Sequence, residues 1–170
     1  DTIIVMPGEY NESINLNGLN IILASNYIFS NDTIDISSTI ISAPENNRCV
    51  TYENAEDSTS LLTGFTIQNG NAIGSGFSSY GGGIFCYNSS PRLENLILKD
   101  NISSSDGGAI SCILSNSLIS NLVVKDNEAI KGGGIDLKNS EVLIEHCTIS
   151  SNTSTNNGGG LSMNNSTINL

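Results

Sequence analysis

A repeat of about 25 residues in the C-terminal half of the chain constrains the fold more than any other sequence feature. Glycine clusters recur at intervals of 26, 25 and 26 residues, and each is followed by an aliphatic residue. The clusters begin at Gly81, Gly107, Gly132 and Gly158. Series of apolar residues and of asparagines keep the same period. Repeats of this length are typical of stacked supersecondary units, so the sequence predicts a solenoid.

The pattern within one repeat distinguishes two kinds of solenoid. Leu93 to Asn101 matches the string L-x-x-L-x-L-x-x-N of leucine-rich repeats, which also need a helical half. The following residues, 102–108, are rich in Ser and Gly and have little helix propensity. The alternation of Ile84 with Cys86, which recurs one period later, is typical of a strand. We therefore predict an all-β fold, a parallel β-helix of five to six coils.

Each coil is predicted to contain three strands. In the clearest repeat these are residues 83–87, 92–94 and 96–99, with a bend at residue 95 and a long turn over 100–108. Equivalent residues of successive coils stack about 4.8 Å apart. Stacked asparagines can satisfy turn backbone groups with their side-chain amides. We therefore expect two asparagine ladders, one of Asn95 and Asn121 and one of Asn101, Asn127 and Asn152.

The chain is predicted to form one domain over residues 1–170, with irregular coils over 1–68 and regular glycine-rich coils over 69–170. Strands in the irregular part are expected at 2–6, 13–16, 19–24, 39–42, 49–52 and 62–68. Residues 25–38 are expected to form a long loop with its own apolar alternation. Natural solenoids are capped. No cap is recognisable in the sequence, so we expect a segment of a longer protein that lacks one or both caps.

Charge excludes two classes of partner. The chain has six Lys and Arg residues and 17 Asp and Glu residues, which gives a net charge of −11. A nucleic-acid binder needs a basic surface, and this chain has none to offer. No apolar run reaches the roughly 20 residues that span a bilayer, so we expect no direct membrane insertion. The acidic, Asn- and Ser-rich coils suit an extracellular surface, with further domains of the same polypeptide as neighbours.

Several segments resemble known β-helix proteins. The opening Asp1 to Glu12 looks like the first coil of the pectin-lyase-like, right-handed parallel β-helix superfamily, and Gly64 to Asn71 looks like its bacterial surface-protein repeats. Gly107-Gly108-Ala109-Ile110 is similar to the G-G-A-I motif of chlamydial polymorphic outer-membrane proteins. Their companion F-x-x-N motif is replaced by Lys125-Asp126-Asn127. The resemblance implies a right-handed β-helix and an extracellular or outer-membrane location. It leaves the activity open, since one scaffold hosts many functions.

Catalytic residues are sparse where enzymes of that superfamily carry them, on the outward face of the first strand and its flanking turns. The outward column there reads Phe85, Ser111, Asp136 and Ser162. Glycoside hydrolases need two carboxyl groups roughly 5–9.5 Å apart. We therefore predict no catalytic residue and no required cofactor, and a non-catalytic segment acting as adhesin or structural scaffold. The alternative is a fragment of a polysaccharide lyase or glycoside hydrolase that acts on acidic polysaccharide through coils outside these residues.

Two side-chain groups are candidate binding sites. Asp100 and Asp126 occupy equivalent turn positions, where they could share a calcium ion or be neutralised by Lys99 and Lys125.

The second group is aromatic: Phe77, Tyr80, Phe85 and Tyr87, around an enlarged turn over residues 70–80. If exposed, these rings could stack on a polysaccharide or a host or cell-surface glycan, with Ser111 and Asp136 bonding its hydroxyls. Alternatively, the rings pack on one another and cover the turn.

Overall fold

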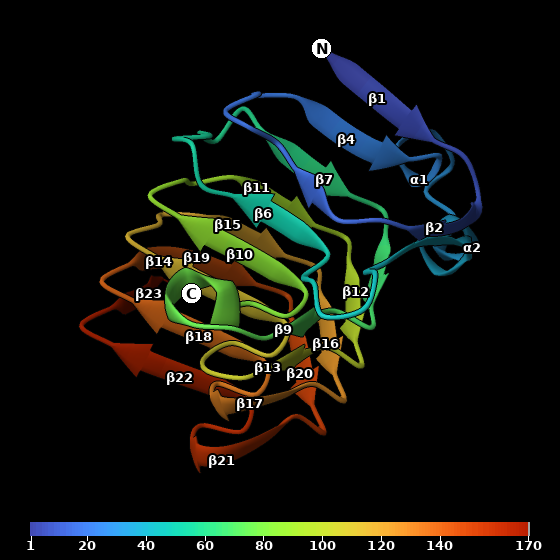
Figure 1. Cartoon of the computed structure of the whole chain (residues 1–170). Coiled ribbons are helices and arrows are strands. Elements are labelled where there is room, and N and C mark those ends of the chain that lie inside the picture. The colour runs from blue at the N-terminus through green and yellow to red at the C-terminus, as the bar shows by residue number, and fades with distance from the viewer. Residues whose placement is uncertain (170) are drawn as a thin grey trace.

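The strands stack in parallel sheets along one axis, as Figure 1 shows for the computed structural model, which describes residues 1–169. The first sheet contains, in order, β1 (Thr2–Val5), β4 (Ile22–Ser25), β7 (Leu61–Thr63), β11 (Arg92–Glu94), β15 (Leu118–Ser120), β19 (Glu141–Glu145) and β23 (Thr167–Asn169). The second contains β2 (Gly8–Asn11), β5 (Thr39–Ser42), β8 (Thr66–Gln68), β12 (Ile97–Lys99), β16 (Val123–Lys125) and β20 (Thr148–Ser150).

The third sheet contains β3 (Ile14–Asn15), β6 (Val50–Tyr52), β10 (Ile84–Tyr87), β14 (Ile110–Ile113), β18 (Ile135–Lys138) and β22 (Leu161–Asn164). A fourth, shorter sheet contains β9 (Asn71–Ala72), β13 (Ile102–Ser103), β17 (Glu128–Lys131) and β21 (Thr153–Asn157). The chain visits the sheets in a fixed cycle, and every pair of neighbouring strands is parallel. The predicted fold class, an all-β parallel β-helix, is therefore confirmed.

Inward side chains form one continuous core along the axis. Ile84 pairs in register with Ile110, and Ile110 with Ile135, and all three are fully buried. Cys86 and Cys112 form the neighbouring inward pair, and their hydrogen bond and burial raise the pKa of the Cys86 thiol well above its usual range. The period-2 alternation therefore assigns the inward face of these strands correctly.

The irregular N-terminal part differs most from the sequence-based expectation. Residues 25–38 contain two short helices, α1 (Tyr27–Ser30) and α2 (Thr33–Ser38), beside the N-terminal coils in Figure 1. The side chain of Asp32 accepts from the Ile34 N–H at 2.9 Å and caps α2, so the apolar alternation there does not mark an extended segment. Strand β2 was not expected, and the long turns also contain the fourth sheet.

No helix in residues 1–169 has the length and apolar character needed to cross a bilayer.

Candidate functional site

The enlarged turn over residues 70–80, which includes β9 and the single turn η1 (Gly76–Ser79), folds over the outer face of the third sheet. The ring centroid of Phe77 lies 4.4 Å from that of Tyr87 and 5.7 Å from that of Phe85. The Tyr80 and Phe85 centroids are 6.3 Å apart. The structure therefore brings the four aromatic residues singled out in the sequence into one cluster, and the green turn of η1 stands in front of the third sheet in Figure 1.

Only part of this aromatic cluster is accessible. Phe85 has no exposed area, because Phe77 and Tyr80 cover it and the guanidinium carbon of Arg48 lies 4.4 Å from its ring centroid. Tyr80 and Tyr87 are half-buried, whereas Phe77 remains 46% exposed. For Phe85 the structure shows the second alternative given above, that the rings pack on one another, since the enlarged turn covers it. Phe77 is the ring with an accessible face.

Ser111 and Asp136 follow Phe85 in register along the same outer face, but both are buried. Glycine turns lie directly over them. A Cβ atom on Gly107 would stand 2.7 Å from the Ser111 Cβ, and one on Gly132 would stand 3.0 Å from the Asp136 Cα. Main chain at this distance leaves no space for a ligand, so these residues do not flank an open aromatic platform as expected.

Burial raises the pKa of Asp136 to about 6, although a hydrogen bond with Ser162 opposes the shift. The nearby carboxylate of Asp106 raises this pKa further, while Lys131 and Lys138 lower it. Asp106 is itself buried. Neither carboxyl group is therefore presented to a polysaccharide on the surface.

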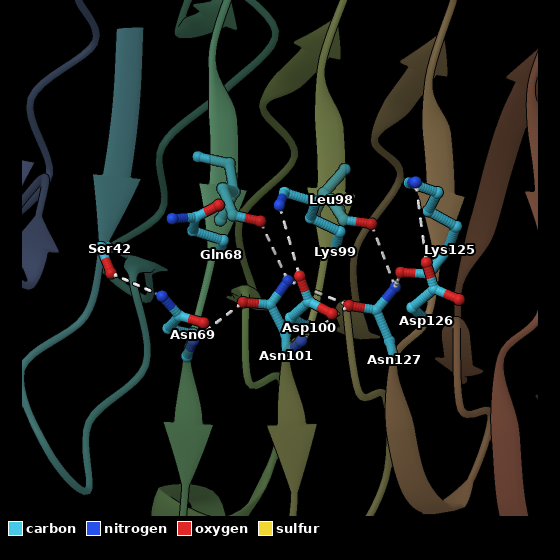
Figure 2. Close-up of polar contacts among 12 residues, drawn as sticks. Ser42, Gln68, Asn69, Leu98, Lys99, Asp100, Asn101, Lys125, Asp126 and Asn127 are labelled. Carbon is cyan, nitrogen blue, oxygen red and sulfur yellow. Dashed lines mark hydrogen bonds and ion pairs between the residues drawn. The ribbon is translucent and has the colours of Figure 1, made fainter. Parts of the chain in front are cut away.

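Asp100 and Asp126 lie in neighbouring coils, and each is paired with the lysine before it (Figure 2). The Lys99 Nζ lies 3.4 Å from the Asp100 Oδ2, and the Lys125 Nζ lies 3.7 Å from the Asp126 Oδ2. Across residues 1–169, no three His, Cys, Asp or Glu side chains gather closely enough to hold a metal ion. Lysine pairing therefore accounts for the charge of both carboxylates.

Asn101, Asn127 and Asn152 form a column of side-chain amides, of which Figure 2 shows the first two. The Asn101 Nδ2 donates to the Asn127 Oδ1 at 3.0 Å, and the Asn127 Nδ2 donates to the Asn152 Oδ1 at 2.9 Å. Asn101 and Asn127 also donate to the main-chain carbonyls of Ile67 and Leu98. Because Asn101 and Asn127 are buried, this column serves structure and not ligand contact.

Asn95 and Asn121 occupy the bend between the first and second sheets with φ of 52° and 55°, and His146 continues their column at 52°. Asparagine tolerates this left-handed conformation. The Asn95 N–H donates to the Ser120 carbonyl at 3.1 Å, and its Nδ2 donates to the Thr63 Oγ1. Asn121 is exposed. This column is therefore held by main-chain bonds and does not form the second amide ladder that we expected.

Glu56 is a buried carboxylate that sequence reasoning missed, because it lies in a polar, turn-like string. It is 1% exposed and accepts from the Gly18 N–H, the Asn54 N–H and the Ser89 hydroxyl, at 2.8, 2.9 and 2.8 Å. Burial alone would raise its pKa, but these hydrogen bonds outweigh burial and hold the pKa below its usual value. Glu56 thus ties together three turn segments, at Gly18, Asn54 and Ser89, between the third and the first sheet.

A groove of about 480 Å³ opens beside the accessible face of Phe77, between β3, β6 and the 70–80 turn. Its polar lining includes Asn15, Asn46, Asn47, Arg48, Thr51 and Glu53. These residues belong to irregular coils, where no repeat marks outward positions, so sequence reasoning did not assemble them. The enlarged turn was the one signal that pointed to this side of the molecule. We call this feature the Phe77 groove.

Comparison with known families gives one match. A sequence model of the Chlamydia polymorphic membrane protein repeat matches residues 95–113. This segment runs from the Asn95 bend through β12, β13 and β14, which is most of one coil. Comparisons with curated proteins and with solved structures gave no match. The molecule is thus a parallel β-helix repeat protein, and over one coil it is similar to a repeat of polymorphic membrane proteins.

Proposed function

We propose that this chain is a non-catalytic segment of a secreted or cell-surface protein, in which the β-helix is a rigid scaffold and the 70–80 turn carries an adhesive surface. The match of residues 95–113 to the polymorphic membrane protein repeat is the observation that carries this proposal. The continuous core and the buried asparagine column support a rigid scaffold. The ligand that we propose is a polysaccharide or a cell-surface glycan.

The alternative, a fragment of a polysaccharide lyase or glycoside hydrolase, has weaker support. Asp136 is the carboxylate on the outward column of the third sheet, and the Gly132 turn covers it. A hydrolase needs two carboxyl groups that reach the scissile bond. Release of uronic-acid products from an acidic polysaccharide by this chain would favour the alternative.

Surface labelling tests the proposal directly. Antibodies raised against this segment are applied to intact cells of the source organism and to permeabilised cells from the same culture. We expect equal labelling of both samples, and loss of the signal after mild protease treatment of the intact cells. Labelling that requires permeabilisation, with no protein in the culture medium, would overturn the proposal.

A further inference from the structure

The Phe77 groove combines an aromatic ring with several fixed hydrogen-bonding groups. Its volume, about 480 Å³, lies in the range of small-ligand sites. Ligand sites of this kind need a surface that the ligand can pack on and a few polar groups that orient it. Both are present here, and the following contacts show that they are held in place before any ligand arrives.

Phe77 is fixed on one side and open on the other. Its ring packs on Tyr87 and Phe85 at centroid distances of 4.4 and 5.7 Å, and its carbonyl accepts a hydrogen bond from the Arg48 Nη2. Nearly half of the residue, 46%, remains exposed. A ring that is supported from behind loses little conformational freedom on binding. The apolar face of a sugar ring is a suitable partner for such an aromatic surface.

The polar groups of the groove are also oriented by the protein. The Asn15 Nδ2 donates to the Glu53 Oε1 at 3.0 Å, and both side chains are exposed on adjacent strands or turns. The Asn71 Nδ2 donates to the Asn46 Oδ1 at 3.4 Å across the turn. The Glu53 carboxylate retains free acceptor sites, since a carboxylate accepts several hydrogen bonds. Carboxylate and amide groups beside an aromatic ring suit the hydroxyl groups of a saccharide.

Charge selects among saccharides. The one cation that lines the groove, Arg48, is held against the Phe85 ring and the Phe77 carbonyl, and Glu53 is close enough to interact with it electrostatically. The groove therefore pairs one positive charge with one negative charge. The whole chain carries a net charge of −11, which repels a polyanion. The net charge of the chain therefore disfavours an acidic polysaccharide.

We propose that the Phe77 groove binds a neutral saccharide, with a sugar ring stacked on Phe77 and its hydroxyl groups bonded to Glu53 and Asn15. This inference rests on the proposed adhesive function and specifies its ligand class and site. It places the site between the irregular and the regular coils, on the groove side of Phe77, the ring that covers Phe85.

Saturation-transfer NMR on the full chain tests this proposal. The neutral probes are cellotetraose, chitotetraose and lactose, and tetragalacturonate is the acidic counterpart. We expect saturation transfer to at least one neutral probe and weaker or no transfer to tetragalacturonate. Absence of transfer to all three neutral probes, or preference for tetragalacturonate, would overturn the assignment.

Two substitutions locate the site. Phe77→Ala removes the stacking surface, and Phe77→Leu removes the aromatic face while keeping apolar contact with Tyr87. We expect each to weaken binding about tenfold. Phe29→Ala is the matched control, because Phe29 is 70% exposed on α1 and lies outside the groove. Thermal unfolding of all variants shows whether the fold is retained.

The outcomes separate this inference from the function on which it rests. Binding that survives both Phe77 substitutions in folded protein, or that is lost equally in Phe29→Ala, would overturn the site. A protein that labels the cell surface but binds no neutral probe would overturn the ligand assignment and leave the surface function standing. Intracellular protein would overturn the proposed function whatever the binding result.

Discussion

The coils of residues 69–169 and those of residues 1–68 share three sheets, but only the former add the fourth, and the two regions support their turns differently. In the regular coils a turn is supported by hydrogen bonds to the equivalent residues of the neighbouring coils, as Asn127 is bonded to Asn101 and Asn152. In the irregular coils single contacts do this work, such as Glu56 and the Asp32 cap of α2. The Phe77 groove lies where the irregular coils meet the enlarged 70–80 turn. The comparison teaches that the proposed binding surface forms at the junction of the two regions, where the enlarged turn interrupts the repeat.

The largest effect should come from placing a charge in the column of Ile14, Val50, Ile84, Ile110 and Ile135. Ile110→Asp buries a charge between fully buried neighbours, and we expect a loss of about 4–5 kcal/mol in the free energy of unfolding. Ile14→Asp, at the half-buried first position of the same column, should cost about half as much. Urea denaturation of both variants measures the difference. Equal losses would mean that the two regions bury this column equally.

The asparagine column provides the next test. Asn127→Ala removes donors to Asn152 and to the Leu98 carbonyl, and it removes the Oδ1 acceptor of the Asn101 main-chain N–H and of one of the two Asn101 amide hydrogens. Leaving such buried groups unpaired should cost about 3 kcal/mol. The control is Asn121→Ala, which changes an exposed left-handed residue and should cost about 1 kcal/mol. Similar denaturation midpoints for the two variants would contradict a special role for the column.

Asp136 should oppose folding at high pH. Its folded-state pKa, about 6, lies above the usual value of 3.8, so the folded protein holds this proton more tightly than the unfolded chain. Its contribution to stability is therefore full below about pH 4 and is lost as the pH rises through 6. We expect Asp136→Asn to exceed the wild type by about 2 kcal/mol near pH 8 and to match it near pH 4. A constant difference across this range would contradict the burial of the carboxyl group.

Glu56, in the irregular half, should show the opposite sign. Its pKa is lowered by hydrogen bonds, so its stabilising contribution is present above the usual pKa of 4.5 and is lost as the pH falls through the folded-state value. Glu56→Gln should cost about 1 kcal/mol at neutral pH, because an amide cannot accept from all three donors. The deficit should shrink on acidification. A Gln variant as stable as the wild type at neutral pH would show that the carboxylate is not needed.

Sequence periodicity predicted the strand register and the inward residues of the repeated coils. It did not predict features that depend on a single contact between distant residues. Leu93 and Ile119 lie inward and in register as their spacing requires, since a slip of one residue would expose the whole apolar set. The burial of Phe85 could not be read from alternation, because it depends on where a turn from residues 70–80 comes to rest. Glu56 was missed for the same reason, since two of its three donors, Gly18 and Ser89, lie at distant positions in the sequence. The Phe77 groove was missed because it depends both on where the 70–80 turn comes to rest and on residues that are distant in the sequence.

The direction of the amide column has a consequence for how the coils come apart. Each amide NH₂ points to the carbonyl oxygen of the following coil, from Asn101 to Asn127 and from Asn127 to Asn152. The dipoles therefore add head to tail, and each bond polarises the next. Within the column Asn127 has an amide partner on both sides and Asn152 on one side, while the Asn101 Oδ1 accepts from the Gly70 N–H at 2.9 Å. The coils are therefore coupled along the column, and their separation should begin at one of its ends and not in the middle.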